Sequence, residues 1–328
     1  MASEPKNLVE PLVSIIIPTK GDLKLLKPCT ESIEKSSYKN YEIIIVDNSR
    51  KEETRKNLGG IKHKMLFYNG PFNFSKINNY AIRYAKGEHV LFLNDDTKVI
   101  THDWMEKMLE HSTRPDVGAV GALLFYPNNT IQHAGVLIGI GGITSHAFEG
   151  LGRGEPGYKG FVNSVRDCSA VTGACLMIKK SLFEQIGGFD EKLAFSFNDI
   201  DLCLRLREKG YRIIYTPYAQ LYHRGTTSRS YVENNEEIRY FVKLYHDLIL
   251  KGDPYYEEDL SRIRPFEPKM GEEKLVLTDI RLTEESEQES YKRLGKYIEA
   301  SNKIRKRHGT KRVIIEFLRF LKKQSFQE

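Results

Sequence analysis

The chain has 328 residues, of which 40% are hydrophobic and 29% are charged. This composition excludes wholesale disorder and is typical of a folded globular protein. No apolar run approaches the roughly 18 to 20 residues that a membrane-spanning helix needs. The polar start, Met1 to Glu10, has no signal-peptide core. The net charge of +6 is modest and by itself indicates no class of partner.

The four cysteines, Cys29, Cys168, Cys175 and Cys203, form no CxxC pair. This spacing disfavours a zinc site or a disulfide and favours buried free thiols in a reducing compartment. We therefore expect a cytoplasmic protein.

Short apolar strands alternate with helices over the first hundred residues. In chain order we expect a strand at 12–17, a helix at 23–36, strands at 41–46 and 64–68, a helix at 74–85 and a strand at 90–93. This alternation predicts a doubly wound sheet of parallel strands, which binds ligands outside the carboxyl ends of its strands. Polar clusters follow three of the strands: Pro18-Thr19-Lys20, Asp47-Asn48-Ser49 and Asn94-Asp95-Asp96. We expect these clusters to form a ligand site.

The second half of the chain has a different pattern. We expect a hairpin of 117–125 and 131–138, followed by a glycine-rich loop over the crevice at 139–160. A strand is expected at 171–178, and then a helix from Ser181 in which Glu184 completes a capping box. A helix at 199–209 and a strand at 212–216 follow. From residue 231 onward the chain has a mainly helical or irregular pattern, and 291–328 holds twelve Lys and Arg against three Asp and Glu.

Asp95 and Asp96 directly follow a hydrophobic strand and are the sharpest local signal. Carboxylates at a strand end can hold a divalent cation, which in turn binds diphosphate oxygens. Such a cation would stabilise the charge on a departing nucleoside diphosphate. A turn or a helix cap favours aspartate equally, so both interpretations remain open at this point.

Three other aspartates also combine structural and chemical interpretations. Asp47 suits a base N–H or a ribose hydroxyl, and capping of the next helix explains it as well. Asp201 is spaced to form an ion pair with Arg205. Asp199 shares a helix face with Leu202 and would point into the crevice, where a general base is needed.

Histidines stand near these carboxylates in the expected fold. His223 follows a short strand that we expect to end at Tyr222. Beside two carboxylates it would be a third metal ligand, since neutral imidazole coordinates Mn²⁺. A structural role for this histidine stays open. His133 and His146 are expected to line the site.

Taken together and in this order, these elements resemble the family 2 glycosyltransferases of the GT-A fold. The resemblance spans Leu12 to Ser230 and is carried by Val13-Ser14-Ile15-Ile16-Ile17-Pro18-Thr19, Ile45-Val46-Asp47-Asn48-Ser49, Phe92-Leu93-Asn94-Asp95-Asp96, Val171-Thr172-Gly173-Ala174-Cys175, Gly187-Gly188-Phe189-Asp190 and the run from Asn198 to Arg205. It implies an α/β fold with a Rossmann-like, mostly parallel central sheet flanked by helices. The implied glycosyltransferase domain covers 1–230, with a nucleotide-binding half at about 12–100 and an acceptor half at about 101–230. A helical, C-terminally basic extension would cover 231–328.

The resemblance also implies an activity: inverting transfer from a UDP- or dTDP-linked sugar to a hydroxyl of a glycan or lipid-linked glycan, with Mn²⁺ or Mg²⁺ as cofactor. Asp199 matches the family's catalytic aspartate, Asp96 matches the metal-binding carboxylate, and His223 matches a metal-binding histidine of some members. Thr19 and Asp47 would hold the base and ribose. The donor site would further include Pro18, Lys20, Ser75, Asn79, Asn94, Asp95, Thr172, Gly173 and Ala174.

Two positions depart from the family pattern. Lys20 stands where many members carry an aromatic residue near the base, and Asn198, a candidate site-lining residue, replaces an acidic residue that often precedes the catalytic aspartate. The segments Phe72–Asn79 and Gln132-His133-Ala134-Gly135 resemble bacterial enzymes of O-antigen and surface-polysaccharide assembly, including rhamnosyltransferases.

Several alternatives stay open from the sequence. An inactive carbohydrate-binding scaffold is one, although it would not need Asp47, Asp96, Asp199 and His223 together. A sugar-nucleotide pyrophosphorylase fits less well, because Pro18-Thr19-Lys20-Gly21-Asp22 is too short and acidic to grip a triphosphate. The basic stripe at 313–321 either packs on the domain or contacts the inner face of the membrane. Nucleic-acid binding is not expected.

Overall fold

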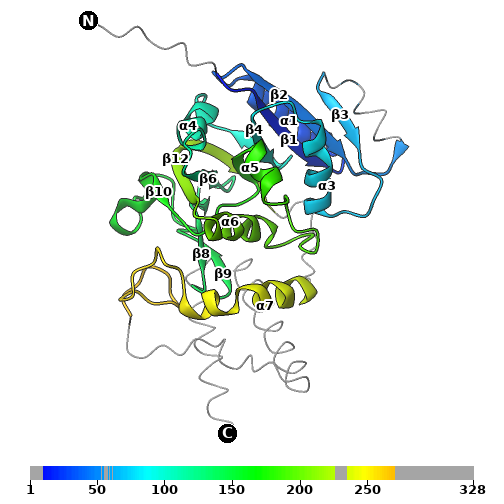
Figure 1. Cartoon of the computed structure of the whole chain (residues 1–328). Helices are drawn as coiled ribbons and strands as arrows, with labels where there is room; N and C mark the ends of the chain where they lie inside the picture. The colour runs from blue at the N-terminus through cyan, green and yellow to red at the C-terminus, as the bar shows by residue number, and fades with distance from the viewer. Residues whose placement is uncertain are drawn as a thin grey trace, which may run out of the picture. The chain divides into compact units, whose positions relative to one another are not determined.

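The described strands form a central sheet of ten strands, shown in Figure 1, and a separate two-stranded sheet of β8 and β9. The strands are β1 (Val13–Thr19), β2 (Tyr41–Asp47), β3 (Lys64–Phe67), β4 (His89–Leu93), β5 (Thr97–Val99), β6 (Val117–Phe125), β7 (Ile131–His133), β8 (Val136–Ile138), β9 (Thr144–His146), β10 (Arg166–Asp167), β11 (Cys175–Lys179) and β12 (Arg212–His223). The helices are α1 (Leu23–Glu34), α3 (Phe74–Ala81), α4 (Trp104–Ser112), α5 (Lys180–Gln185), α6 (Asn198–Glu208) and α7 (Asn235–Lys251), with 3-10 helices η1 (Ile82–Tyr84) and η2 (Tyr158–Asn163). This computed structural model describes residues 10–52, 54, 58, 60, 62–225 and 235–269, all within the compact unit Met1–Met270.

The central sheet has the order β10-β12-β6-β11-β4-β1-β2-β3, and β5 and β7 pair with β12 and β6. Strands β3, β2, β1 and β4 run parallel, as the alternating pattern predicts. Strand β11 is antiparallel to both β4 and β6 and joins the two halves of the sheet. The expected α/β class, with a mostly parallel sheet flanked by helices, is confirmed.

Burial on both faces of the sheet explains the β-branched run in β1. Ile15, Ile16 and Ile17 are fully buried, as is usual for parallel strands covered by helices on both sides. Ile15 and Ile17 belong to the core cluster that includes residues of α1 and α4, such as Leu26 and Trp104. Hydrophobic burial on this scale is the main favourable contribution to folding.

Three local expectations were wrong in detail. The helix at 181 begins one residue earlier as α5, and Lys179 at its N-cap makes no side-chain cap bond, so Ser181 and Glu184 form no capping box. The strand expected at 171–178 begins only at Cys175, because the preceding residues leave the sheet to contact other loops. The glycine-rich stretch at 139–160 contains β9, which pairs with β8.

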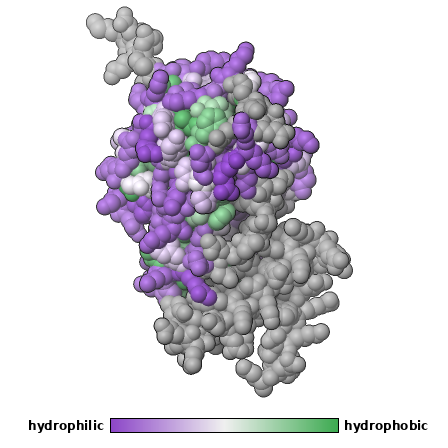
Figure 2. All heavy atoms as spheres, turned by 90° about the vertical axis from the view of Figure 1, so that its right-hand side faces the viewer, coloured by the Kyte–Doolittle hydropathy of each residue, from purple (hydrophilic) through white to green (hydrophobic). Residues whose placement is uncertain are grey.

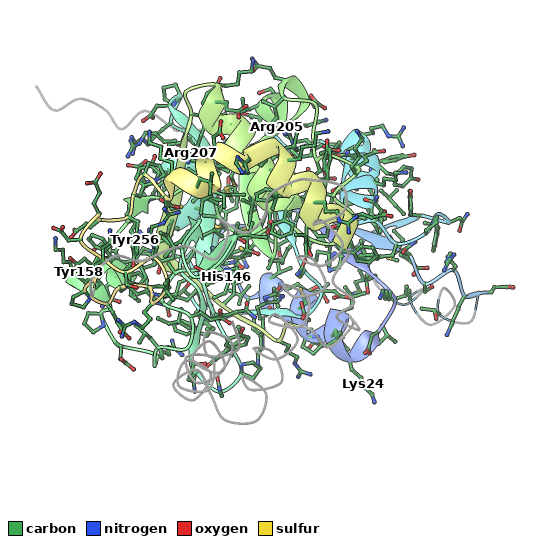
Figure 3. All side chains as sticks on the ribbon, turned by 90° about the horizontal axis from the view of Figure 1, so that it is seen from below. Lys24, His146, Tyr158, Arg205, Arg207 and Tyr256 are labelled. Atoms are coloured by element: carbon green, nitrogen blue, oxygen red, sulfur yellow. The ribbon has the colours of Figure 1, made fainter. Side chains whose placement is uncertain are left out.

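Helix α7 lies along α6, as both Figure 1 and Figure 3 show. Phe241 of α7 stacks on Phe197 with ring centroids 4.5 Å apart. The buried Glu237 carboxylate accepts the backbone N–H groups of Phe195 and Ser196 at 3.1 and 2.8 Å. Helix α7 therefore holds the loop that leads into α6.

The surface seen from the side of β3 and α3 is largely hydrophilic where the structure describes it (Figure 2). Within the described part of the chain, no helix is long and apolar enough to cross a membrane. The basic stripe predicted at 313–321 lies outside the described residues, so its membrane contact stays a prediction.

Candidate active site

The polar clusters predicted from the sequence meet at the carboxyl edge of the parallel strands. Thr19 at the end of β1 is in register with Asp47 at the end of β2, and β4 ends beside them. The Thr19 hydroxyl donates to Asp95 Oδ2 at 2.6 Å. Asp47 is fully buried, and its Oδ1 accepts the Ser49 backbone N–H at 2.7 Å. The three strand ends therefore form one continuous polar edge.

Asp96 and His223 lie together at this edge. His223 Nε2 is 3.1 Å from Asp96 Oδ1 and 3.2 Å from the Asn94 amide nitrogen. The other ring nitrogen, Nδ1, makes a short hydrogen bond to Gln132 Oε1, and the Gln132 amide donates to the His223 carbonyl at 3.3 Å. Because Gln132 Oε1 can only accept, His223 Nδ1 donates to it, and the other ring nitrogen, Nε2, faces Asp96.

The two adjacent carboxylates have opposite pKa shifts. Burial, together with the charge of Asp96, raises the pKa of Asp95 to about 6 despite the bond from Thr19. Burial also acts to raise the pKa of Asp96, but the hydrogen bond and charge of His223 outweigh it, and the pKa of Asp96 falls below its ordinary value. Asp96 is therefore the more firmly ionised of the pair.

Asp199 occupies the start of α6 and is held by two backbone N–H groups. Gly173 N donates to its Oδ2 at 2.7 Å and Ile200 N donates to its Oδ1 at 2.9 Å. A side chain at position 173 would meet Asp199 Cβ at 3.3 Å and the Phe74 ring at 3.4 Å. Glycine at this position therefore permits the close approach of the loop to the Asp199 carboxylate.

The loop Thr172-Gly173-Ala174 links Asp199 to the strand-end cluster. Ala174 O accepts the backbone N–H of Asn94 at 3.1 Å. The Thr172 backbone N–H approaches His133 Nε2 at 3.4 Å. Residues that are far apart in the sequence are thus joined by one loop.

His133 and His146 form a hydrogen-bonded pair with Nδ1 atoms 2.7 Å apart. Burial holds the pKa of His133 well below its ordinary value, so its ring is neutral. Its Nε2 faces the backbone N–H of Gly135 at 3.2 Å and must accept. The His133 proton is therefore on Nδ1 and is donated to His146.

Other predicted site residues contact neighbouring loops. The Ser75 hydroxyl donates to the Leu193 carbonyl at 2.6 Å, and the Asn79 amide bonds to both backbone groups of Phe189. Asn198 is buried and donates to the same Leu193 carbonyl at 3.4 Å. These contacts fix the loop before α6, and a direct role of the three side chains in donor binding stays a prediction.

Two residues outside the predicted set are placed at the site. Gln132 orients His223, and the sequence feature that points to Gln132 is its place in the segment Gln132-His133-Ala134-Gly135. The Phe72 ring lies 5.1 Å from Lys20 Nζ, which puts an aromatic group beside the position where the family pattern carries one. The sequence feature that points to Phe72 is the segment Phe72–Asn79, which begins at this residue.

A divalent metal fits Asp96 and His223. The pair offers an ionised carboxylate oxygen and an imidazole nitrogen 3.1 Å apart, and Mn²⁺ accepts both ligand types. Among the described residues, no cluster of three or more His, Cys, Asp or Glu is arranged to hold a metal. Mg²⁺-type sites commonly use one or two carboxylates and take substrate phosphates as the remaining ligands.

The fold and this edge together define the class: a glycosyltransferase domain of the GT-A fold. The sequence profile of glycosyl transferase family 2 matches residues 14–187, more than half of the chain. The chain belongs to this family.

The relatives include bacterial polysaccharide enzymes. Protein y4gI of Sinorhizobium fredii, described as uncharacterized, is 40% identical over 268 residues, covering 76% of this chain and 29% of that protein. The O-antigen biosynthesis protein RfbC of Myxococcus xanthus is 33% identical over 322 residues, covering 94% of this chain and 24% of that protein. Rhamnosyltransferase WbbL of Escherichia coli is 24% identical over 226 residues, covering 65% of this chain and 83% of that protein. The chain thus spans less than a third of the length of y4gI and RfbC.

Solved structures show the same fold. Mannosyltransferase PcManGT from Pyrobaculum calidifontis, in complex with GDP-Man and Mn²⁺, matches with a TM-score of 0.53 at 17% identity, covering 73% of this chain and 64% of that one. GalNAc-T7 with UDP, GalNAc and Mn²⁺ matches with a TM-score of 0.56 at 13% identity, covering 72% of this chain and 48% of that one. At this identity the likeness establishes the fold alone.

Proposed function

We propose that the chain transfers a sugar from a UDP- or dTDP-linked donor to a hydroxyl of a glycan or lipid-linked glycan, with inversion at the anomeric carbon. The single observation that carries the proposal is the loop Thr172-Gly173-Ala174, which joins the Asp199 carboxylate to the strand end that carries Asp96. A direct displacement needs one base and one stabilised leaving group, and this loop connects the candidates for both. The names of RfbC and WbbL favour surface-polysaccharide synthesis as the setting.

The donor would bind along the carboxyl edge. Thr19 and Asp47 would receive the base and ribose, and Phe72 offers a ring for stacking beside Lys20. Asp96 and His223 would hold Mn²⁺ or Mg²⁺, which would neutralise the charge that develops on the leaving diphosphate. PcManGT and GalNAc-T7, which share the fold, each bind Mn²⁺ together with a nucleotide or nucleotide-sugar, and this supports the same class of cofactor here.

Asp199 would act as the general base. Each of its oxygens accepts one backbone N–H, so the carboxylate is fixed in place while lone pairs remain for an acceptor hydroxyl. In the transfer, the acceptor oxygen forms its bond to the anomeric carbon as the bond from that carbon to the diphosphate oxygen breaks. The hydroxyl proton passes to Asp199, and the electron pair of the broken bond leaves with the diphosphate.

Calorimetric titration of UDP, dTDP and GDP, each with and without Mn²⁺, tests the donor site. We expect one pyrimidine diphosphate to bind tightly only with metal, and Asp96→Ala to abolish that binding. Asp199→Asn should keep nucleotide affinity while lowering the transfer rate by about 10²- to 10⁴-fold, the usual contribution of general-base catalysis. Asp103→Asn, an exposed aspartate before α4, is the matched control. Absence of nucleotide binding under every condition would refute the proposal in favour of the inactive scaffold.

A further inference from the structure

We propose that His133 is a positioning residue, which holds the Asp199 carboxylate in place through the loop Thr172-Gly173-Ala174. This inference rests on the proposed function, because His133 acts on the transfer through the candidate base. His133 is the last residue of β7, and its side chain is fully buried. Its effect on the reaction therefore passes through the loop and not through contact with a substrate.

Two hydrogen bonds and one residue connect His133 to the base. The Thr172 backbone N–H donates to His133 Nε2 at 3.4 Å, and the next backbone N–H, that of Gly173, donates to Asp199 Oδ2 at 2.7 Å. Because peptide units are planar, only the φ and ψ angles of Thr172 separate these two N–H groups. A rotation at Thr172 would turn the Gly173 N–H away from the carboxylate. The bond to His133 opposes that rotation.

The other hydrogen bonds of Thr172 stay within its own stretch of chain. Its Oγ1 accepts the Ala174 N–H at 3.3 Å, and its carbonyl accepts the Cys175 N–H, also at 3.3 Å. Strand β11 begins only at Cys175, so the Thr172 N–H bonds to a side chain and not to a neighbouring strand. At the far end of the loop, the Ala174 carbonyl is tied to Asn94 at the end of β4. The bond to His133 supplies the tie at the near end.

The His133 ring is itself fixed from two sides. Two residues before the loop, the Ala170 carbonyl accepts the Val136 N–H at 2.8 Å, so the chain after β7 is held beside the chain before Thr172. On the other side, His133 Nδ1 lies 2.7 Å from Nδ1 of His146, a residue of β9 that Figure 3 labels. The ring therefore has one orientation, with Nε2 directed at the loop.

A neutral histidine suits this task because one ring nitrogen donates while the other accepts. Burial is the main cause that holds the pKa of His133 well below its ordinary value, and neighbouring positive charges add to it. His146 accepts the proton on Nδ1, which leaves the lone pair of Nε2 for the backbone N–H groups of Thr172 and Gly135. The hydrogen bond of one ring nitrogen thus sets the role of the other.

Two substitutions separate the roles of the two ring nitrogens. His133→Gln keeps an acceptor as many bonds from Cα as Nε2 is, whereas His133→Asn reaches only as far as Nδ1. We expect His133→Asn to lower kcat by about 10- to 100-fold, because a small displacement of a catalytic group has a large cost. His133→Gln should recover most of that loss. The affinity for UDP with Mn²⁺ should stay unchanged in both variants, since the strand ends that we propose to hold the nucleotide are not displaced.

His89→Asn is the matched control for a loss of stability. His89 is also a buried histidine with a ring nitrogen bonded to a backbone carbonyl, that of Ser112, but it lies at the start of β4, away from the carboxyl edge. Its substitution should lower Tm and leave kcat unchanged. Equal kcat in His133→Asn and His133→Gln would overturn the proposal. So would a loss of UDP affinity as large as the loss of kcat, because His133 would then support the whole site by packing alone.

Amide hydrogen exchange over residues 170–175 of the full chain tests the loop without any transfer reaction. We expect His133→Asn to speed exchange there by about twofold to tenfold, as for the loss of one hydrogen bond, and His133→Gln to restore the wild-type rate. If His133→Asn does not fold, His146→Phe makes the same test, since it keeps a ring at a half-buried position and removes the partner of His133 Nδ1. Unchanged exchange would overturn the proposal. If the wild-type chain transfers no sugar, the proposed function fails, while the exchange rates still decide whether His133 fixes the loop.

Discussion

The contact between Tyr245 of α7 and Asp201 of α6 offers a quantitative test of how α7 supports the proposed catalytic helix. The Tyr245 hydroxyl donates to Asp201 Oδ1 at 2.7 Å, and Arg205 donates to Oδ2 at 2.9 and 2.8 Å. The predicted Asp201–Arg205 ion pair is thus present. Burial and the charge of Asp201 raise the pKa of Tyr245, so the hydroxyl stays protonated and donates throughout the usual pH range.

Tyr245→Phe keeps the ring, which packs 4.9 Å from Phe241, and removes only the hydroxyl. Asp201 is 2% exposed, so water cannot replace the lost donor. A hydrogen bond to a buried charged group contributes about 1.5 to 3 kcal/mol to the free energy of unfolding. For a domain of this size, about 1 kcal/mol moves Tm by about 2 °C, and we expect a fall in Tm of about 3 to 6 °C.

Differential scanning calorimetry measures this shift, and Tyr240→Phe is its control. Tyr240 lies on the same helix and donates to Asp190 Oδ2, also at 2.7 Å, but at a more exposed position. Exposed charged contacts contribute about 0 to 1 kcal/mol, so the control should lose about 2 °C or less. If the two variants lose the same stability, burial does not decide the strength of these bonds and the reasoning is refuted.

Three further outcomes follow from the site and the core. Gln132→Leu should lower Mn²⁺ affinity by about 10- to 100-fold, since it removes the group that orients His223, whereas the control Gln132→Glu retains the acceptor oxygen. Calorimetry with UDP present measures the Mn²⁺ affinity, and equal affinities of Gln132→Leu and the wild-type chain would remove Gln132 from the metal site. Phe72→Ala should weaken nucleotide binding by about 1 to 3 kcal/mol and Phe72→Tyr should not, as expected for base stacking. If Phe72→Ala binds the nucleotide as tightly as the wild-type chain, the base does not stack on this ring. Burial lowers the pKa of His89, against the opposing hydrogen bond to the Ser112 carbonyl. The contribution of neutral His89 to the free energy of unfolding is therefore fully present above the unfolded-state pKa of about 6.5 and is lost as the pH falls below that value. His89→Gln should therefore flatten the fall in Tm between about pH 7.5 and about pH 5.5, and an unchanged slope would assign that fall to other groups.

Much of the fold was predictable because it depends on local patterns. The fully buried run Ile15 to Ile17 is hydrophobic without alternation, and that pattern distinguishes a parallel strand covered on both faces. The capping box at Ser181 was not a reliable signal, because a tertiary contact replaces it. The Lys180 backbone N–H donates to the Glu88 carbonyl at 2.8 Å, so the first turn of α5 is satisfied by a neighbouring segment that no local motif reveals.

The site was predictable where it lies at strand ends and unpredictable where it depends on distant partners. Topology alone brings Thr19, Asp47 and Asn94 to one edge, because parallel strands end on the same side of the sheet. The bond from His223 to Gln132 joins residues 91 positions apart. It exists because β12 is one strand from Arg212 to His223, where the sequence pattern indicated a strand at 212–216 and a second short strand ending at Tyr222.

The placement of Asp199 depends on a helix beyond the region matched by the family profile. Phe197, two residues before Asp199, has a φ of 62°, a left-handed conformation that is rare for a bulky residue and costs about 1 to 3 kcal/mol. Such a conformation persists only when its surroundings fix it. Phe241 stacks on the Phe197 ring, and Glu237 accepts the two preceding backbone N–H groups, both from α7. Residues 235–251 therefore pack against the loop that leads into α6, and we predict that loss of α7 would free Phe197 to relax and would move the carboxylate that we propose as the base.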